Sequence, residues 1–185
     1  MNFSDLDDLI HSGVTNIVLD SDVVLDSDEK SRYLKGIVLD VDGLVIDGAG
    51  HTVDARRKAR IFHCRAEGVV LKNFTFKRGF SVNGGAIYND HGDLNIENSR
   101  FEASSSKKWG GAIYNSGDLS ISDCEILKCE AKRGGAVLNH SKLSISGCSI
   151  TKNSSNRGGA IYAISESETV ISKSIFDGNS TDKNH

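Results

Sequence analysis

Charged residues beside a repeated Gly-Gly pair are the first group whose types and spacing could perform chemistry. Lys108 and the only tryptophan, Trp109, precede one such pair, Lys132 and Arg133 precede the next, and Arg157 precedes the last. If these turns stack in space, a tryptophan flanked by cations could hold a sugar ring and pair with acidic groups of a glycan. The alternative is a solvated turn in which the tryptophan covers an edge of the core.

Carboxylates near the start of the chain form the second group. Residues 1–54 contain 12 Asp and Glu against 3 Lys and Arg, a formal charge of -9. Carboxylates that alternate on turns can bind Ca²⁺, which takes about six to eight oxygen ligands, so Asp40, Asp42 and Asp47 are candidate metal ligands. The competing interpretation is that these aspartates cap turns, because no EF-hand spacing is present.

The cysteines and histidines give weaker evidence of a functional site than these two groups. Cys124 and Cys148 occupy equivalent positions one period apart, close enough for a disulfide if the periods stack. We favour a buried pair of thiols, because Ser99 and Ser174 stand at the equivalent positions and indicate a site for a small side chain. The histidines are interpreted as turn residues, since none is joined to a nucleophile and an orienting acid. The four cysteines lack zinc spacing, so no cofactor is expected.

The elements that must position these residues follow a repeat. GGAIYN begins at Gly84 and again at Gly110, GGAVLN begins at Gly134 and GGAIYA at Gly158, so the intervals are 26, 24 and 24 residues. Glycine can form a corner that would strain other residues, and stacked asparagine amides can hydrogen-bond between layers. The residues with this predicted structural role are Gly84, Gly85, Asn89, Gly110, Gly111, Asn115, Gly134, Gly135, Asn139, Gly158 and Gly159.

The spacing of apolar residues between these motifs predicts strands. Apolar residues alternate at spacing two, and three short strands can be identified in a period, for example LSI, CEI and AIY. Helical repeats have longer periods of roughly 33 to 47 residues. The predicted fold is therefore all-β: a right-handed, single-stranded parallel β-helix with about 24–26 residues per coil. We expect Ile61 to begin the apolar column that contains Ile87, and His63 to begin the asparagine column.

The pattern predicts a single domain over residues 1–185. Residues 3–13 are expected to form a capping helix, with Ser4 as N-cap and Gly13 at its end. Irregular acidic coils follow at 14–60, regular repeats at 61–179 and a tail at 180–185. The C-terminal end shows no similar cap, which indicates either a fragment of a longer array or pairing with another protein chain at that end.

The GGAI motif followed by Phe-x-x-Asn resembles the repeats of chlamydial polymorphic outer-membrane proteins. It resembles still more closely the β-helix repeats of methanogen adhesin-like surface proteins. Phe176 to Asn179 matches Phe-x-x-Asn fully, and Leu44 to Ala55 looks like the first coils of the adhesin-like group. The resemblance covers nearly the whole chain and implies the pectin-lyase-like β-helix fold and a secreted or cell-surface location. The chain shows no signal peptide.

Three functions from different classes follow, of which the weakest is an intracellular self-association module that stacks through its open C-terminal end. The first is a non-catalytic adhesin-like or structural module that contacts surface glycans along its sides. The second is a carbohydrate-active enzyme, of the pectate lyase or polygalacturonase type, that uses the acidic coils with Arg56, Arg57 or Arg60. No Gly-His-Gly motif is present, the only Asp-Asp pair is in the predicted helix, and outward positions of the longest strand are mostly serine, so the first is preferred. A net charge of -3 and the lack of a long apolar stretch predict neither nucleic-acid binding nor membrane insertion.

Overall fold

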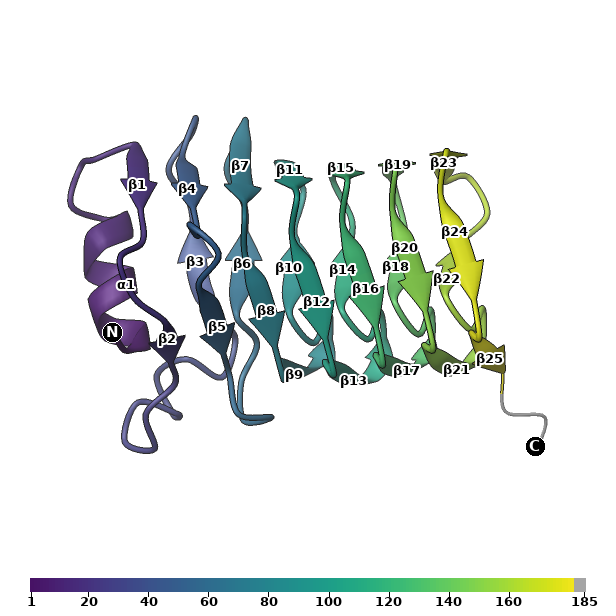
Figure 1. The fold of residues 1–185 in the computed structure, drawn as a ribbon, viewed down its shortest axis with the longest axis horizontal. Coiled ribbons are helices and arrows are strands. Elements are labelled where there is room, and N and C mark those ends of the chain that lie inside the picture. The colour runs from purple at the N-terminus through teal and green to yellow at the C-terminus, as the bar shows by residue number, and fades with distance from the viewer. Residues whose placement is uncertain (182–185) are drawn as a thin grey trace.

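The computed structural model describes residues 1–181 as an elongated solenoid of parallel strands with one helix at its N-terminal end (Figure 1). Successive coils advance along the long axis from the N-terminus to the C-terminus. Each strand pairs in parallel with its equivalents in the neighbouring coils, residue for residue in most coils. The predicted all-β parallel solenoid with a short N-terminal helix is confirmed.

Four sheets run along the solenoid, and we number them in the order in which a coil passes through them. Sheet 1 contains β3 (Ile37–Leu39), β6 (Phe62–Cys64), β10 (Ile87–Asn89), β14 (Ile113–Asn115), β18 (Val137–Asn139) and β22 (Ile161–Ala163). Sheet 2 contains β1 (Asn16–Val18), β4 (Val45–Asp47), β7 (Val69–Lys72), β11 (Asp93–Glu97), β15 (Asp118–Ser122), β19 (Lys142–Ser146) and β23 (Glu168–Ser172). Sheet 3 contains β2 (Val23–Val24), β5 (Thr52–Asp54), β8 (Thr75–Lys77), β12 (Arg100–Glu102), β16 (Glu125–Leu127), β20 (Ser149–Thr151) and β24 (Ile175–Asp177). Sheet 4 contains β9 (Phe80–Asn83), β13 (Ser105–Trp109), β17 (Glu130–Arg133), β21 (Ser154–Arg157) and β25 (Ser180–Thr181).

Sheet 4 corrects the prediction of three strands per coil. The first coils do have three strands, but from β9 onward every coil has a fourth. Its segments are polar, such as SSKKW and EAKR, and lack the apolar alternation that indicates a strand. They form strands because each lies beside an equivalent segment that completes its backbone hydrogen bonds. Ser180 and Thr181 of the expected tail belong to this sheet, and residues 182–185 lie outside the described residues.

The register of β6 differs from the sequence prediction by one residue. Ile87 pairs with Phe62, not with Ile61, and Asn89 pairs with Cys64, not with His63. The interval from Phe62 to Ile87 is 25 residues, which equals the interval from Val69 to Leu94 in sheet 2. Ile61 instead occupies the corner, where it donates its N–H to the carbonyl of Ala86.

The core is a continuous column of apolar side chains inside the coils. Inward positions repeat from coil to coil, as in Ile96, Ile121 and Ile145 of sheet 2, and are almost fully buried. Cys124 and Cys148 are buried free thiols in this interior. The core begins under the helix and extends to Ile150, with the partly buried Ala160 and Ile161 packed against its end, so it positions the outward side chains of these coils.

The repeated Gly-Gly and Asn residues lie at the two ends of the sheet 1 strands. The first glycine of each pair, at Gly84, Gly110, Gly134 and Gly158, has a φ of 59, 64, 65 and 65°. The second glycine, at Gly85, Gly111, Gly135 and Gly159, lies so close to the next coil that a Cβ would collide with backbone atoms. Asn89, Asn115 and Asn139 are fully buried and stack in register at the opposite end of the strand.

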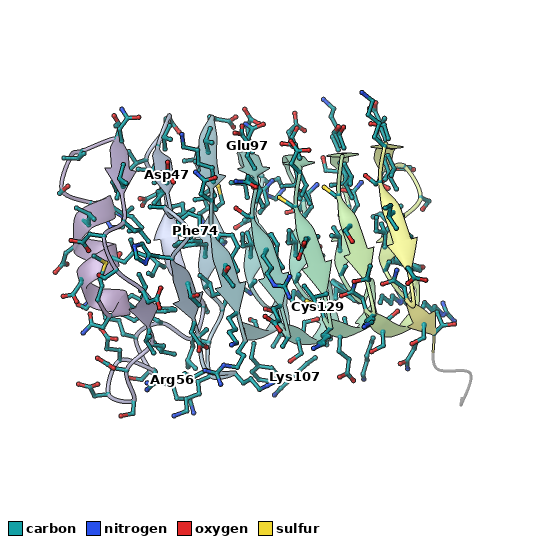
Figure 2. The ribbon with its side chains drawn as sticks, in the orientation of Figure 1. Asp47, Arg56, Phe74, Glu97, Lys107 and Cys129 are labelled. Carbon is teal, nitrogen blue, oxygen red and sulfur yellow. The ribbon has the colours of Figure 1, made fainter. Side chains whose placement is uncertain are left out.

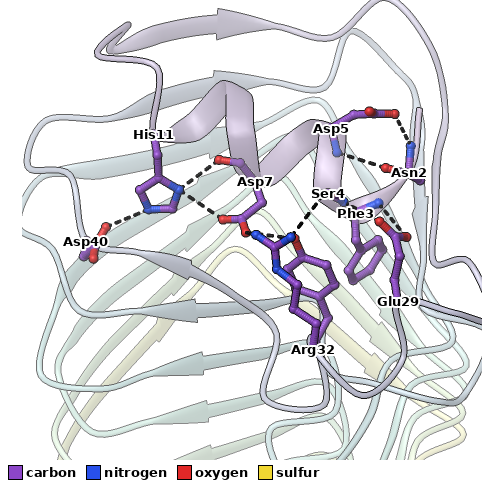
Figure 3. A network of polar contacts seen from close by, with 10 residues as sticks. Asn2, Phe3, Ser4, Asp5, Asp7, His11, Glu29, Arg32 and Asp40 are labelled. Carbon is purple, nitrogen blue, oxygen red and sulfur yellow. Dashed lines mark hydrogen bonds and ion pairs between the residues drawn. The ribbon is translucent and has the colours of Figure 1, made fainter.

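Helix α1 (Phe3–Ile10) covers the first coil with Phe3, Leu6 and Ile10. It begins one residue before the predicted N-cap Ser4 and ends three residues before Gly13. Asn2 is the N-cap, because its side chain accepts from the Asp5 N–H while the Asp5 carboxylate accepts from the Asn2 N–H, a reciprocal capping box (Figure 3).

The loop that follows β2 holds the helix in place. The Glu29 carboxylate accepts from the N–H groups of Phe3 and Ser4, at 3.3 and 2.8 Å (Figure 3). At the other end His11 lies between Asp7 and Asp40, with Nε2 3.0 Å from the Asp40 carboxylate. The helix therefore packs by apolar contact and is fixed at both ends by side chains of later coils.

Candidate functional site

Sheet 4 and its two corners carry most of the cations of the regular coils. We call this surface the basic flank and define it by residues 56–58, 77–84, 102–109, 127–134 and 151–158. Figure 2 shows two of its residues, Arg56 and Lys107, at the lower edge of the solenoid. Its cations are Arg56, Arg57, Lys58, Lys77, Arg78, Lys107, Lys108, Lys128, Lys132, Arg133, Lys152 and Arg157. Its only carboxylates are Glu102 and Glu130.

Few of these cations are neutralised by the protein itself. Arg78 pairs with Asp54, and this pairing raises the pKa of the Arg78 guanidinium. Within residues 1–181, no other cation of the basic flank lies within 4.0 Å of a carboxylate, whereas Arg32, Arg65 and Arg100 on other faces all do. Unpaired cations on one face create a positive potential that attracts anions.

A hollow lies at the N-terminal end of the basic flank, with a volume of about 380 Å³. Its apolar lining comes from Phe80 and from the exposed side chains of Leu34 and Val82. Its charged lining consists of Lys30, Lys35, Arg57, Lys58 and Lys107. The Lys107 ammonium lies 5.9 Å from the centroid of the Phe80 ring. No carboxylate lines the hollow, so it suits an anion that also carries an apolar face.

The structure brings together the residues predicted from the sequence as a basic corner. Trp109, Arg133 and Arg157 are in register on successive strands of sheet 4. Lys108 and Lys132 precede them and are exposed, and Lys108 lies in a bulge of β13. These side chains belong to the basic flank.

Aromatic rings beside this corner were missed by the sequence interpretation. Trp109 stacks on Tyr114, with ring centroids 5.8 Å apart and planes at 22°. The Arg133 guanidinium lies 5.6 Å from the Tyr162 ring centroid. Tyr114 and Tyr162 belong to an outward column of sheet 1. The sequence signal of this column was the tyrosine at the fifth position of GGAIYN and GGAIYA. Trp109 therefore has one face against the protein and remains half-buried.

The candidate calcium ligands are held by separate partners. Asp40 contacts His11, and Asp42 accepts from the Glu67 N–H at 2.9 Å. Asp47 accepts from the Asn73 amide and the Ala49 N–H, both at 2.8 Å, and these hydrogen bonds hold the pKa of Asp47 below its usual value. In the part of the chain that the structure describes, no group of three or more His, Cys, Asp or Glu is arranged to hold a metal ion.

Comparison with known families identifies the architecture. The family described as a right handed beta helix region matches residues 42–183. The chain belongs to the right-handed β-helix family. Searches of curated proteins and of solved structures found no match. No helix among the described residues of this β-helix is long and apolar enough to cross a membrane.

His63 is a second feature that sequence reasoning did not find, since it was interpreted as a turn residue. In the β-helix it lies in β6, nearly buried, with Nε2 2.9 Å from the Asp90 carboxylate. Tyr88 stacks on its ring at 4.9 Å, and burial lowers the pKa of His63 below its usual value. A histidine beside a carboxylate matches two of the three members of a catalytic triad, but His63 lines neither the hollow of the basic flank nor the hollow between sheets 2 and 3.

Arg60, a candidate of the enzyme hypothesis, has a structural position in this β-helix. Its guanidinium is buried and donates to the backbone carbonyls of Lys35, Asn83 and Gly84, at 2.9, 2.8 and 3.1 Å. Burial lowers its pKa to about 10. Arg60 takes the corner position that glycine has in later coils, and its side chain binds two other segments of backbone, at Lys35 and at Asn83 and Gly84.

A polar hollow of about 620 Å³ lies at the corner between sheets 2 and 3. The Asn98 amide donates to Asn73 at 2.7 Å, and Asn73 donates to Asp47 at 2.8 Å. Arg100 in the same hollow pairs with Glu125. Arg100, Glu125, Asn73, Asn98 and Asp47 in this hollow therefore have partners within it, in contrast with the unpaired cations of the basic flank.

Proposed function

We propose that this β-helix is a non-catalytic, adhesin-like binding module that holds an acidic glycan along its basic flank. The observation that carries the proposal is the set of cations on sheet 4 and its corners that have no carboxylate partner within residues 1–181. Unpaired Lys and Arg on a rigid sheet are available for the carboxylate or sulfate groups of a ligand, and Arg can bind them in bidentate fashion.

The repeat geometry supports a polymeric ligand that runs along the axis. Coils are stacked about 4.8 Å apart, so equivalent side chains form rows parallel to the axis. Trp109, Arg133 and Arg157 form one such row. A polymer with a charge at regular intervals can contact several members of a row at once, and weak contacts then add to a useful affinity.

Apolar surface on the flank favours a sugar over a bare anion. The hollow with Phe80, Leu34 and Val82 can receive the apolar face of a ring, and the exposed part of Trp109 offers a second contact. The resemblance of the GGAI repeats to adhesin-like surface proteins supports a role at the cell surface. The mostly polar outer column Asn95, Ser120 and Ser144 of sheet 2 supports binding rather than proton-transfer chemistry.

The test measures binding of the chain to polygalacturonate and to a sulfated polysaccharide, with dextran as a neutral control. We expect saturable binding to the acidic polymers that weakens as salt screens the charges. The double variant Lys107→Glu, Lys132→Glu should lose at least about tenfold in affinity, which is about 1.4 kcal/mol. The matched control is Lys72→Glu, Lys142→Glu, which changes the net charge equally on sheet 2 and should bind within about twofold of the native chain.

Three results would overturn the proposal. The first is no binding to any acidic polysaccharide at low salt by folded protein. The second is equal loss of affinity in the flank and control variants, which would indicate an effect of net charge alone. The third is release of new reducing ends from a polymer, which would favour the carbohydrate-active enzyme.

A further inference from the structure

The two ends of the solenoid differ in how the core is closed. At the N-terminal end α1 covers the first coil (Figure 1). At the C-terminal end the inward side chains of Ile171 and Phe176 are 44% and 41% exposed, although their equivalents one coil earlier, Ile145 and Ile150, are buried. The last coil therefore presents the cross-section of the core to solvent.

Outward positions of the last coil also become apolar. Val170 follows Ser144 in an outward column of sheet 2, and it is 55% exposed. Ile175 follows Ser149 in sheet 3, and it is 65% exposed. The sheet 3 column is polar from Thr52 to Ser149 and becomes apolar only at Ile175. The sheet 2 column begins with the half-buried Val45 and Val70, is polar from Asn95 to Ser144 and becomes apolar again at Val170. Exposed apolar residues at the end of both columns indicate that the rim is covered together with the core.

The backbone of β23 has a free edge with a defined pattern. Glu168 donates its N–H to Ser141, and Ser172 accepts from Gly147, so both residues direct their backbone groups to the preceding coil. Because this direction alternates along a strand, Thr169 and Ile171 direct their N–H and C=O groups to the open end. Such an edge is a template for another strand.

We propose that a second copy of this chain docks on the C-terminal end, related by a two-fold axis that crosses β23 at Val170. The two copies of β23 then pair antiparallel, with Thr169 opposite Ile171 of the second copy as a hydrogen-bonded pair. The same axis places β25 against its own copy. It places β22 against β24 of the second copy, and these two strands have equal length and lie on either side of β23.

Symmetry and charge favour a second copy as the occupant. Head-to-tail stacking is blocked because α1 covers the other end, so the assembly closes at two copies. The two-fold also places Glu168 opposite Ser172 and next to Lys173 of the second copy, which brings opposite charges together.

The area covered in this dimer indicates how tightly the two copies are expected to associate. A five-residue strand is about 17 Å long, so the covered area is on the order of 500 Å² per chain. The sum over two chains is at the lower end of specific interfaces, and we therefore expect a dimer that dissociates on dilution.

A cross-link tests the geometry. Opposite residues of a non-hydrogen-bonded antiparallel pair have Cα atoms about 4.5 Å apart, within the range of a disulfide. Oxidised Val170→Cys should form a covalent dimer of twice the 19.9 kDa chain mass. Ser120→Cys, at an exposed position of the same outward column, should not. The native cysteines are buried and give little background. Equal cross-linking of both variants, or none of Val170→Cys, would overturn the proposal.

A second variant tests the backbone pairing without disturbing the coil. Ile171→Pro removes an N–H that is directed to the open end, so the bonds between β19 and β23 remain. Light scattering across a dilution series should show a dimer for the native chain and a monomer for Ile171→Pro and Val170→Lys, with unchanged circular dichroism. A native chain that is monomeric at every concentration, or that forms assemblies larger than two copies, contradicts the proposal.

Discussion

Asn115 donates its side-chain amide to the side-chain oxygen of Asn139, 2.8 Å away in the next coil. Asn89 donates in the same way to Asn115, also at 2.8 Å, and all three side chains are fully buried. The Asn115 amide also lies within hydrogen-bonding distance of the carbonyls of Gly117 and Lys142. One side chain therefore satisfies polar groups of three successive coils in an environment from which water is excluded.

Asn115→Ala should destabilise the protein strongly. The substitution leaves several buried polar groups of neighbouring coils without partners, and each unsatisfied group costs about 1–3 kcal/mol. We expect a loss of at least about 3 kcal/mol in the free energy of unfolding, measured by urea titration. The control is His140→Ala, on an exposed residue of the next coil. Its free energy of unfolding should stay within about 0.5 kcal/mol of that of the native chain. An equal loss of unfolding free energy in the two variants would contradict this role of the stacked asparagine side chains.

Gly111→Ala should prevent normal folding. A Cβ at Gly111 would collide with the carbonyl oxygen of Gly135 and lie 2.6 Å from the Glu130 nitrogen, and neither backbone atom can move without separating two coils. The comparison is Gly147→Asn at a corner where φ is +66° and where Asn98 and Asp123 adopt a similar backbone in earlier coils. There the added atom meets only the Asp123 side chain, which can rotate. Soluble expression and melting temperature should separate the variants, with Gly147→Asn close to native.

Stability should depend on pH through His63. Burial lowers the pKa of His63 in the folded state below the usual 6.5, and Asp90, Arg65 and Arg60 surround it. The unfolded chain therefore takes up this proton first as the pH falls, so the contribution of His63 is present above about pH 6.5 and is lost at lower pH, toward the folded pKa. His63→Gln should show a smaller fall in melting temperature than the native chain between pH 7 and pH 5. An identical pH profile, with His140→Gln as the exposed control, would show that His63 has no such role.

Cys148 should act as a hydrogen-bond acceptor in the core. Its sulfur accepts from the Cys124 N–H at 3.5 Å, as the Ser174 hydroxyl accepts from the Cys148 N–H at 3.0 Å one coil later. Cys148→Ser should therefore be tolerated, with a change below about 1 kcal/mol. Cys148→Ala leaves the buried N–H of Cys124 unpaired and should cost about 1–3 kcal/mol more than the serine variant. Equal unfolding midpoints would contradict this role of the sulfur.

The repeat pattern predicts one part of the candidate site and not the other. The basic corner at Lys108, Trp109, Lys132, Arg133 and Arg157 could be predicted because equivalent positions of a regular repeat must stack. The hollow could not be predicted. Lys30 and Leu34 reach Phe80 from a loop of the first coils, and that loop follows no repeat.

The sequence by itself determined the solenoid. The same local pattern recurs in each coil: the period, the alternation of apolar residues, and the Gly-Gly and Asn positions. Parallel stacking that buries the apolar residues of one coil therefore buries those of the next coil as well. Tertiary structure alone decided the register of Phe62, the fourth sheet and the cations that remain unpaired. These features depend on residues about 25 positions apart that meet only when the coils stack, and on backbone hydrogen bonds whose partners lie in another coil.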